Sequence, residues 1–136
     1  MPMKLLIVDD SQVCLVLTRG YVQTFRASWI CTTAESAEQA MVLIEKQKFD
    51  AYVLDYNLPG RNGLELARWI RDKDQQCFIG LLTSNIMNYV EDQAVNDNMH
   101  YYRKPATADV IQQFVADIES YIPESPQATD FKALGL

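Results

Sequence analysis

The residues best suited to chemistry in this sequence stand where short apolar runs end. Asp55 directly follows the apolar run 51–54, and Asp9 and Asp10 directly follow the run 4–8. In open α/β sheets the ligand crevice lies beyond the carboxyl ends of the strands. If these runs are strands of one sheet, the three carboxylates lie at the same edge of it.

Two further apolar runs end in polar groups of a different kind. The run 77–82 leads directly into Thr83, and the run 99–102 leads through Arg103 to Lys104. A hydroxyl and a compact ammonium are suited to bind the oxygens of an anionic group such as a phosphoryl group. The four runs together therefore offer three carboxylates, one hydroxyl and one ammonium.

Such a set of groups favours phosphoryl transfer to a carboxylate with the help of a divalent cation. Two like unit charges about 4 Å apart repel by roughly 4 kcal/mol at an effective dielectric near 20, so clustered carboxylates alone repel an anionic phosphodonor. Mg²⁺ prefers carboxylate, carbonyl and water oxygens and offsets that repulsion. We therefore expect Mg²⁺ as the cofactor and an acyl phosphate as the product.

The elements that must position these groups alternate along the chain between apolar runs and segments of helical period. The expected strands are 4–8, 29–32, 51–54, 77–82 and 99–102, and the expected helices are 11–25, 34–49, 62–73, 86–95 and 107–118. Ser11 and Thr107 are suitable N-caps. Because parallel strands need crossover connections, this alternation predicts a parallel sheet covered by helices on both faces.

Composition is that of one ordinary globular domain with a sizeable core. The chain has 136 residues, of which 49% are hydrophobic and 22% charged, and its formal net charge is -6. A net negative charge does not attract nucleic acid or an anionic membrane, so the composition does not indicate binding to either. No basic and apolar leader, no run long enough to cross a bilayer and no metal-type cysteine pair is present. We expect reduced thiols and a cytoplasmic protein.

The chain changes character after Ile122. Residues 123–136 are rich in proline and polar residues and offer few large apolar groups to bury, among them Phe131 and Leu134. We therefore expect one domain over residues 1–122, followed by a flexible C-terminal tail over 123–136.

Residues 4–121 resemble the receiver domain of two-component response regulators. Four motifs carry the resemblance, namely Val8-Asp9-Asp10-Ser11, Leu54-Asp55-Tyr56-Asn57-Leu58-Pro59-Gly60 with Gly63-Leu64, Leu82-Thr83-Ser84, and Tyr101-Tyr102-Arg103-Lys104-Pro105. One of them alone is weak evidence, whereas four in this order and spacing are strong. The resemblance implies a flavodoxin-like (βα)5 three-layer sandwich with a five-stranded parallel sheet, and a role in phosphorelay signalling.

The resemblance also implies roles for individual residues. Asp55 is implied as the phosphoacceptor, with Thr83 and Lys104 in contact with the phosphoryl group. The bond between Lys104 and Pro105 is cis in this family. The implied ligands of Mg²⁺ are the side chains of Asp9, Asp10 and Asp55 and the carbonyl oxygen of Asn57.

A switch from Thr83 to Tyr101 is also implied. If Thr83 moves toward a new phosphoryl oxygen, the Tyr101 ring can turn inward and alter the surface of the last strand and its two flanking helices. Each of these residues also has a structural explanation: the aspartates suit ordinary turns, Thr83 suits a strand, and either Tyr101 or its neighbour Tyr102 could belong to the core.

The expected function is that of a stand-alone receiver, phosphorylated by a sensor histidine kinase or a histidine phosphotransfer protein, that then docks to a downstream target protein. Such a protein is no enzyme beyond its own phosphorylation and dephosphorylation. Residues 86–98 and 106–122 contain no Lys or Arg, so charge-paired dimerisation is not expected, and a monomer or weak dimer is.

Two alternatives remain open at this point. A relay intermediate would pass its phosphoryl group on to a histidine phosphotransfer protein. A phosphatase of the haloacid dehalogenase type also joins an Asp nucleophile to Mg²⁺, Thr and Lys, but its nucleophile normally lies on the first strand with a second Asp two residues later. The segment Asp9-Asp10-Ser11 lacks that spacing.

Overall fold

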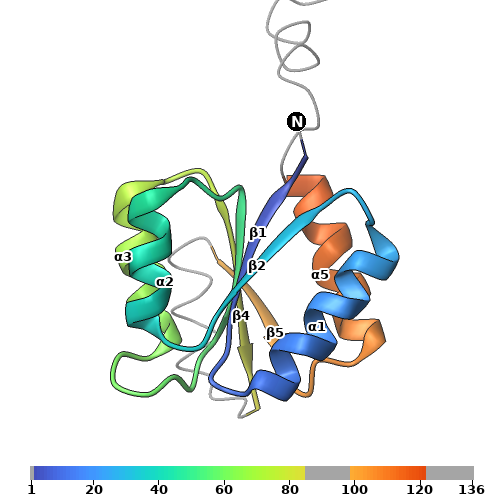
Figure 1. The fold of residues 1–136 in the computed structure, drawn as a ribbon, viewed down its shortest axis with the longest axis horizontal. Coiled ribbons are helices and arrows are strands. Elements are labelled where there is room, and N and C mark those ends of the chain that lie inside the picture. Colours follow the sequence, from blue (N-terminus) through green and yellow to red (C-terminus); the bar gives the residue numbers. More distant parts are fainter. Residues whose placement is uncertain (1, 85–98, 122–136) are drawn as a thin grey trace, which may run out of the picture.

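A parallel sheet forms the centre of the molecule. The computed structural model describes residues 2–84 and 99–121, and the sheet runs through both parts (Figure 1). Its strands are β1 (Lys4–Val8), β2 (Ile30–Ala34), β3 (Ala51–Asp55), β4 (Phe78–Thr83) and β5 (His100–Arg103). They pair in the order β2-β1-β3-β4-β5, and every pair is parallel.

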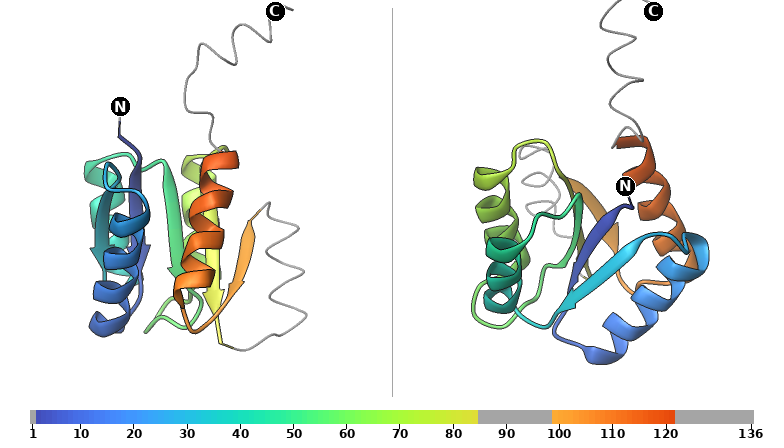
Figure 2. Two further views of the ribbon diagram at one scale, coloured as in Figure 1. Left: turned by 90° about the vertical axis from the view of Figure 1, so that its right-hand side faces the viewer. Right: turned by 45° about the horizontal axis from the view of Figure 1, so that its top comes forward.

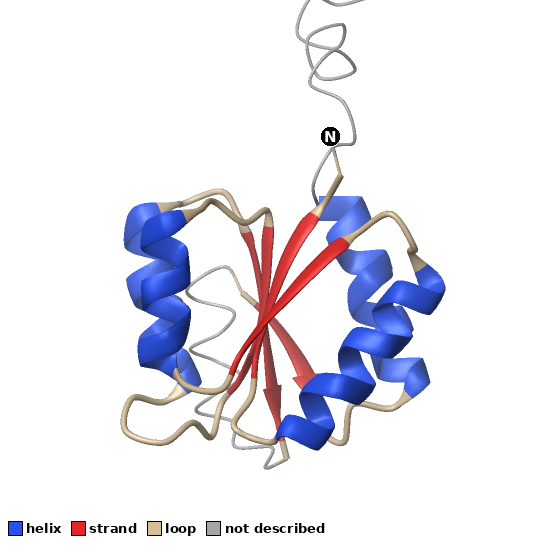
Figure 3. Ribbon diagram, viewed as in Figure 1, coloured by secondary structure: helices blue, strands red, loops and turns tan. Residues whose placement is uncertain are grey.

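Helices cover both faces of the sheet, as the alternating pattern predicts. One layer holds α1 (Gln12–Phe25) and α5 (Ala108–Tyr121), and the other holds α2 (Ala37–Lys46) and α3 (Gly63–Lys73). Figure 2 shows α1 and α5 on the same side of the sheet, and Figure 3 shows the strands between the two layers. The helix expected over 86–95 and the tail expected over 123–136 lie outside the described residues.

Polar side chains cap the starts of the helices, and Ser11 and Thr107 do so as expected. The Ser11 hydroxyl accepts a hydrogen bond from the Cys14 amide at 3.3 Å, and the Thr107 hydroxyl accepts one from the Val110 amide at 3.3 Å. Asn62 and Glu65 form a reciprocal capping box at the start of α3. Each cap satisfies an amide that the first turn leaves without an intrahelical partner.

The start of α2 differs from the expected one. Helix α2 begins at Ala37 rather than at Ala34, and β2 continues to Ala34 rather than ending at Thr32. The Ser36 hydroxyl accepts from the Gln39 amide and caps the helix. Residues 30–34 can remain extended because each of them pairs with a residue of β1.

Two apolar layers fill the space between the sheet and its helices. Strands β3 and β4 are buried along their whole length, as expected for central strands covered on both faces. Alternate residues of each strand enter opposite layers, so that Leu54 packs toward α2 and α3 whereas Val53 packs toward α1 and α5. None of the helices in the described part of the chain is long and apolar enough to cross a bilayer.

Candidate functional site

The polar residues that end the apolar runs meet at one edge of the sheet. Strand pairing aligns Val8 with Leu54, so that Asp9 and Asp55 emerge side by side from β1 and β3. Carboxylate oxygens of Asp9, Asp10 and Asp55 all lie within 4.8 Å of one another. The expected gathering of three carboxylates is therefore present.

Lys104 bridges two of these carboxylates. Its Nζ lies 2.9 Å from Oδ2 of Asp9 and 3.0 Å from Oδ2 of Asp55. Asp9 is 4% exposed, Asp55 is 2% exposed, and the Lys104 side chain is 19% exposed. The ammonium therefore neutralises charge in a place that water reaches poorly.

Backbone groups fix both ends of this arrangement. The Asp9 Oδ1 accepts from the Ser11 amide at 2.9 Å, and the Asp55 Oδ1 accepts from the Asn57 amide at 3.1 Å. On the opposite side, the Lys104 amide donates to the carbonyl oxygen of Thr83 at 2.9 Å. The peptide bond between Lys104 and Pro105 is cis, as expected.

Burial and neighbouring charges shift the pKa values of both Asp55 and Lys104. Burial is the largest influence on Asp55 and raises its pKa, the charge of Asp9 raises it further, and the hydrogen bonds from Lys104 and Asn57 act in the opposite direction. For Lys104 the largest single influence is burial, which lowers the pKa. The hydrogen bonds and charges of Asp9 and Asp55 outweigh it, and the pKa of Lys104 is raised.

The backbone at the start of α3 packs directly against the end of β3 that carries Asp55. The N-terminus of α3 touches the end of β3, because a Cβ on Gly63 would lie 2.2 Å from the carbonyl oxygen of Asp55 and 2.9 Å from the Cα of Tyr56. The Gly63 amide donates to the Tyr56 carbonyl at 2.8 Å. A side chain at position 63 would therefore displace the strand end that carries Asp55. The motif contains this glycine, but its spacing alone gives no reason for the contact.

Thr83 and Tyr101 lie on neighbouring strands next to the carboxylates. Thr83 is buried at the end of β4 and is paired with Arg103, and Tyr101 is paired with Leu81. Since residues two apart on a strand share a face, Thr83 and Tyr101 lie diagonally on the face that α2 and α3 cover. The half-buried Tyr101 packs against the apolar layer on that face.

The neighbouring tyrosine has a different environment. Tyr102 points to the other face of the sheet, is buried there, and donates its hydroxyl to Oδ2 of Asp117 on α5 at 2.6 Å. Its ring packs edge-on against Phe114, with ring centroids 5.9 Å apart. Burial and the Asp117 carboxylate both raise the pKa of Tyr102. Tyr102 is thus the core tyrosine of the two.

The carboxylate cluster fits a hard divalent cation. Three carboxylates within 4.8 Å offer oxygen ligands from two sequence segments, and the exposed Asp10 leaves one side of the cluster open to solvent. Mg²⁺ is usually bound by one or two carboxylates together with water and substrate oxygens. The donor set therefore suits Mg²⁺, whereas the cysteines are free and none belongs to this cluster.

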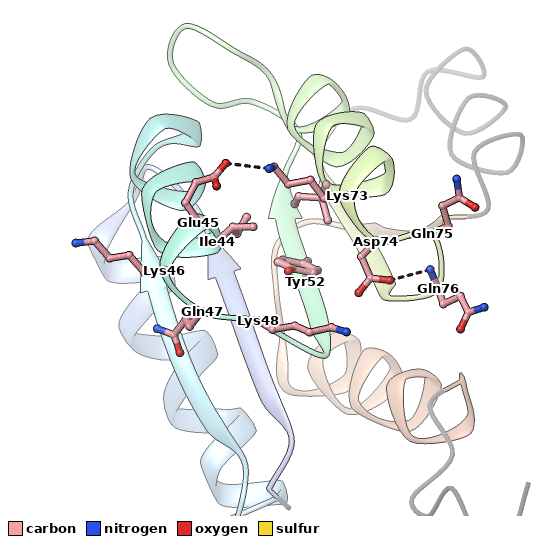
Figure 4. Close-up of a pocket in the computed structure, with 11 residues that line it drawn as sticks. Ile44, Glu45, Lys46, Gln47, Lys48, Tyr52, Lys73, Asp74, Gln75 and Gln76 are labelled. Atoms are coloured by element: carbon pink, nitrogen blue, oxygen red, sulfur yellow. Dashed lines mark hydrogen bonds and ion pairs between the residues drawn. The ribbon is translucent and has the colours of Figure 1, made fainter.

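A separate cavity of about 710 Å³ lies at the opposite edge of the sheet. It is formed by the carboxyl ends of α2 and α3, with the Tyr52 ring between them (Figure 4). Glu45 and Lys73 form an ion pair across it, with Oε1 and Nζ 2.9 Å apart. Because helices and strands run in opposite directions here, this cavity is remote from the carboxylate cluster and has no part in its chemistry.

Comparison with known proteins identifies the family. The family model of the response regulator receiver domain matches residues 5–116. The chain therefore belongs to the receiver domain family of two-component response regulators.

Individual relatives agree with this membership. The chain is 34% identical over 113 residues to histidine kinase 3 of Arabidopsis thaliana, a match that covers 80% of this chain and 10% of that protein. It is 25% identical over 128 residues to the polar-differentiation response regulator DivK of Brucella anthropi, covering 92% of this chain and all of that protein. The chain spans from 10% to 63% of the length of the first three curated relatives.

Solved structures show the same fold. The chemotaxis protein CheY4 of Vibrio cholerae superposes with a TM-score of 0.78 at 21% identity, covering 87% of this chain and 99% of that one. The response regulator TrrA of Thermotoga maritima, crystallised with Mg²⁺ and BeF, gives a TM-score of 0.73 at 28% identity, covering 85% and 98%. The flavodoxin-like fold expected from the sequence is confirmed.

Proposed function

We propose that the chain receives a phosphoryl group on Asp55 and returns it to water or to another protein. A carboxylate oxygen of Asp55 would attack phosphorus while the bond from phosphorus to the donor atom breaks, and the leaving group takes up a proton. The observation that carries the proposal is the bridge from Lys104 to Asp9 and Asp55 inside a cluster of three carboxylates.

The order of strands favours Asp55 as the nucleophile over its two neighbours. Strand β3 lies between β1 and β4. A phosphoryl group on Asp55 would therefore have the carboxylates of Asp9 and Asp10 on one side and the hydroxyl of Thr83 on the other. Neither Asp9 nor Asp10 has that position, because both follow β1.

We propose that Asp9, Asp10, Asp55 and the Asn57 carbonyl oxygen hold Mg²⁺. Bound there, the cation would supply charge neutralisation and oxygen coordination for an anionic substrate. The Mg²⁺ and BeF bound by TrrA support this choice of ion. Lys104 and Thr83 would bind phosphoryl oxygens, because phosphoryl transfer depends mainly on positioning and charge stabilisation.

The donor would be a sensor histidine kinase or a histidine phosphotransfer protein, and the chain itself would catalyse no other reaction. Three free cysteines suit a reducing compartment, and we propose the cytoplasm. Phosphorylation would draw Thr83 toward the new oxygen and let Tyr101 turn inward, which alters the surface around β5 and α5 for a target protein. If Tyr101 keeps the same rotamers, measured by NMR, with and without beryllofluoride and Mg²⁺, this switch is wrong.

Intact-mass spectrometry after incubation with acetyl phosphate and Mg²⁺ tests the phosphorylation itself. We expect the wild type to gain the mass of one phosphoryl group and Asp55→Asn to gain none. Asp72→Asn, the same change at an exposed position of α3, should behave as the wild type. An adduct that persists in Asp55→Asn would overturn the proposal.

A relay intermediate is the second candidate, favoured by one observation. Several matched proteins are sensors, including histidine kinase 3 and the virulence sensor protein BvgS of Bordetella bronchiseptica, 38% identical over 69 residues. Phosphotransfer assays separate the two functions. In such an assay a relay intermediate passes a radiolabelled phosphoryl group rapidly to a histidine phosphotransfer protein, whereas a terminal receiver loses the phosphoryl group to water.

A further inference from the structure

The outward face of α1 is unusually apolar. Val13, Val16, Leu17 and Tyr21 are 69%, 70%, 54% and 39% exposed, and with Gly20 they occupy positions i, i+3, i+4, i+7 and i+8. We call these five residues the α1 stripe. Exposed apolar patches of this kind mark interaction surfaces.

The stripe is separate from the face that α1 uses in the core. Leu15, Thr18 and Val22 are the buried residues of the helix, and helical periodicity places them on the side opposite the stripe. Elsewhere in the described residues, the other exposed large apolar side chains are Ile30 and Val42, outside this helix. The stripe is thus an apolar face that core packing does not explain.

Helix α5 ends beside one end of this stripe. Arg26, the C-cap of α1, donates from Nε to Oε2 of Glu119 at 2.7 Å. Glu119 lies two residues before Tyr121, the last residue of α5. The chain therefore leaves α5 close to the carboxyl end of α1 (Figure 1).

The next fifteen residues, 122–136, are long enough to reach the whole stripe. Fully extended, they would span up to about 50 Å, whereas the fourteen residues of α1 extend over about 21 Å. This segment lies outside the described residues. Two of its large apolar residues, Phe131 and Leu134, are separated from Tyr121 by enough chain to lie against Val13, Val16 and Leu17.

Charge also matches between the two segments. Residues 122–136 contain Glu124 and Asp130 against one base, Lys132. The sole charged residue of α1 is Arg19, next to Gly20 of the stripe. An attached segment also has a high effective concentration at its own surface, which favours it over a second copy of the chain.

We propose that residues 122–136 dock on the α1 stripe, with Phe131 and Leu134 as the apolar contacts. The stripe begins at Val13, three residues after Asp10. The docked segment would therefore border the carboxylate cluster.

Methyl NMR on the full chain tests this contact. We expect nuclear Overhauser effects from the Phe131 ring and the Leu134 methyls to the methyls of Val13, Val16 or Leu17. The double variant Phe131→Asp/Leu134→Asp should lose them and shift the α1 methyl signals. The matched variant Gln127→Asp/Thr129→Asp adds the same charge to the same segment but should leave the α1 signals unchanged.

Three results would overturn the proposal. The first is the absence of these Overhauser effects together with α1 methyl signals that do not respond to Phe131→Asp/Leu134→Asp. The second is a response of equal size to both double variants, which would show a charge effect without apolar docking. The third is a dimer in sedimentation that survives the loss of Phe131 and Leu134 but not Val16→Asp, because a second copy would then cover the stripe.

Discussion

Replacing Lys104 by methionine should destabilise the folded protein, because two buried carboxylates lose their counter-charge. The Lys104 Nζ lies 2.9 Å from Asp9 and 3.0 Å from Asp55. At an effective dielectric near 20, each pair at this distance attracts by about 5.6 kcal/mol, and desolvation of the three groups offsets part of that. Breaking a buried pair by removing one partner typically costs about 3–5 kcal/mol. We expect Lys104→Met to lower the free energy of unfolding by that amount without divalent cation.

Urea unfolding followed by circular dichroism in the presence of EDTA measures this loss. Lys73→Met is the matched control, because Lys73 pairs with Glu45 at 2.9 Å but the two side chains are 43% and 60% exposed. The control should lose about 1 kcal/mol or less. The difference between the two variants reports the combined effect of burial and of the second carboxylate that Lys104 contacts, whereas Lys73 has one carboxylate partner among the described residues and also lies over the Trp69 ring, 4.7 Å from its centroid.

Magnesium provides a second readout of the same effect. A divalent cation at the carboxylate cluster would supply the missing positive charge, so Mg²⁺ should raise the stability of Lys104→Met more than that of the wild type. The reasoning is refuted if Lys104→Met costs no more than Lys73→Met, because Lys104 would then not neutralise the cluster.

Three further substitutions, the first with a matched control, test other contacts. Gly63→Ala should cost about 1–3 kcal/mol of unfolding free energy and slow phosphorylation, since its Cβ would collide with the end of β3. The control Gly20→Ala, at a position with open space around it, should be neutral or stabilising by up to about 1 kcal/mol. Tyr102→Phe should cost about 0.5–1.5 kcal/mol through the lost hydrogen bond to α5, and an unchanged urea midpoint would contradict this. The hydrogen bond from Arg26 lowers the pKa of Glu119 from 4.5, so the pair stabilises the fold above that pH and loses its effect as pH falls below it. Arg26→Gln should therefore cost up to about 1 kcal/mol at pH 7 and less at pH 3, and an equal cost at both pH values would argue against the ion pair.

The sequence predicts most of the architecture because local signals and global packing agree. Ser11 and Thr107 each cap a helix as expected, and the apolar runs 51–54 and 77–82 become the central strands β3 and β4. The predicted end of the second strand at residue 32 was wrong, because pairing with β1 keeps residues up to Ala34 extended. Local sequence carries no information about that pairing.

The site is predictable in its residue types but not in its contacts. Four motifs at strand ends place Asp9, Asp55 and Lys104 together, since parallel strands share one edge. Periodicity does not show that one ammonium bridges two carboxylates, because that depends on side-chain geometry. The contact of Gly63 with the end of β3 is likewise a matter of how a helix packs on a strand.

The distinction between the two tyrosines shows the same limit. Both Tyr101 and Tyr102 lie in an apolar run, and either suits a core position. The register of β5 against β4 decides the matter, since it directs Tyr102 toward α5 and Tyr101 toward the opposite layer. A single-residue change of register would exchange their roles.

The most direct measurement is the chemical location of the phosphoryl group. Borohydride reduces an acyl phosphate to the alcohol, so an aspartyl phosphate is converted to homoserine, which peptide mass spectrometry can locate. After incubation with acetyl phosphate and Mg²⁺, we expect homoserine at position 55 and unmodified Asp9 and Asp10. Homoserine at position 9 or 10, or a phosphorylated chain with none at 55, would contradict the central claim that Asp55 is the phosphoacceptor.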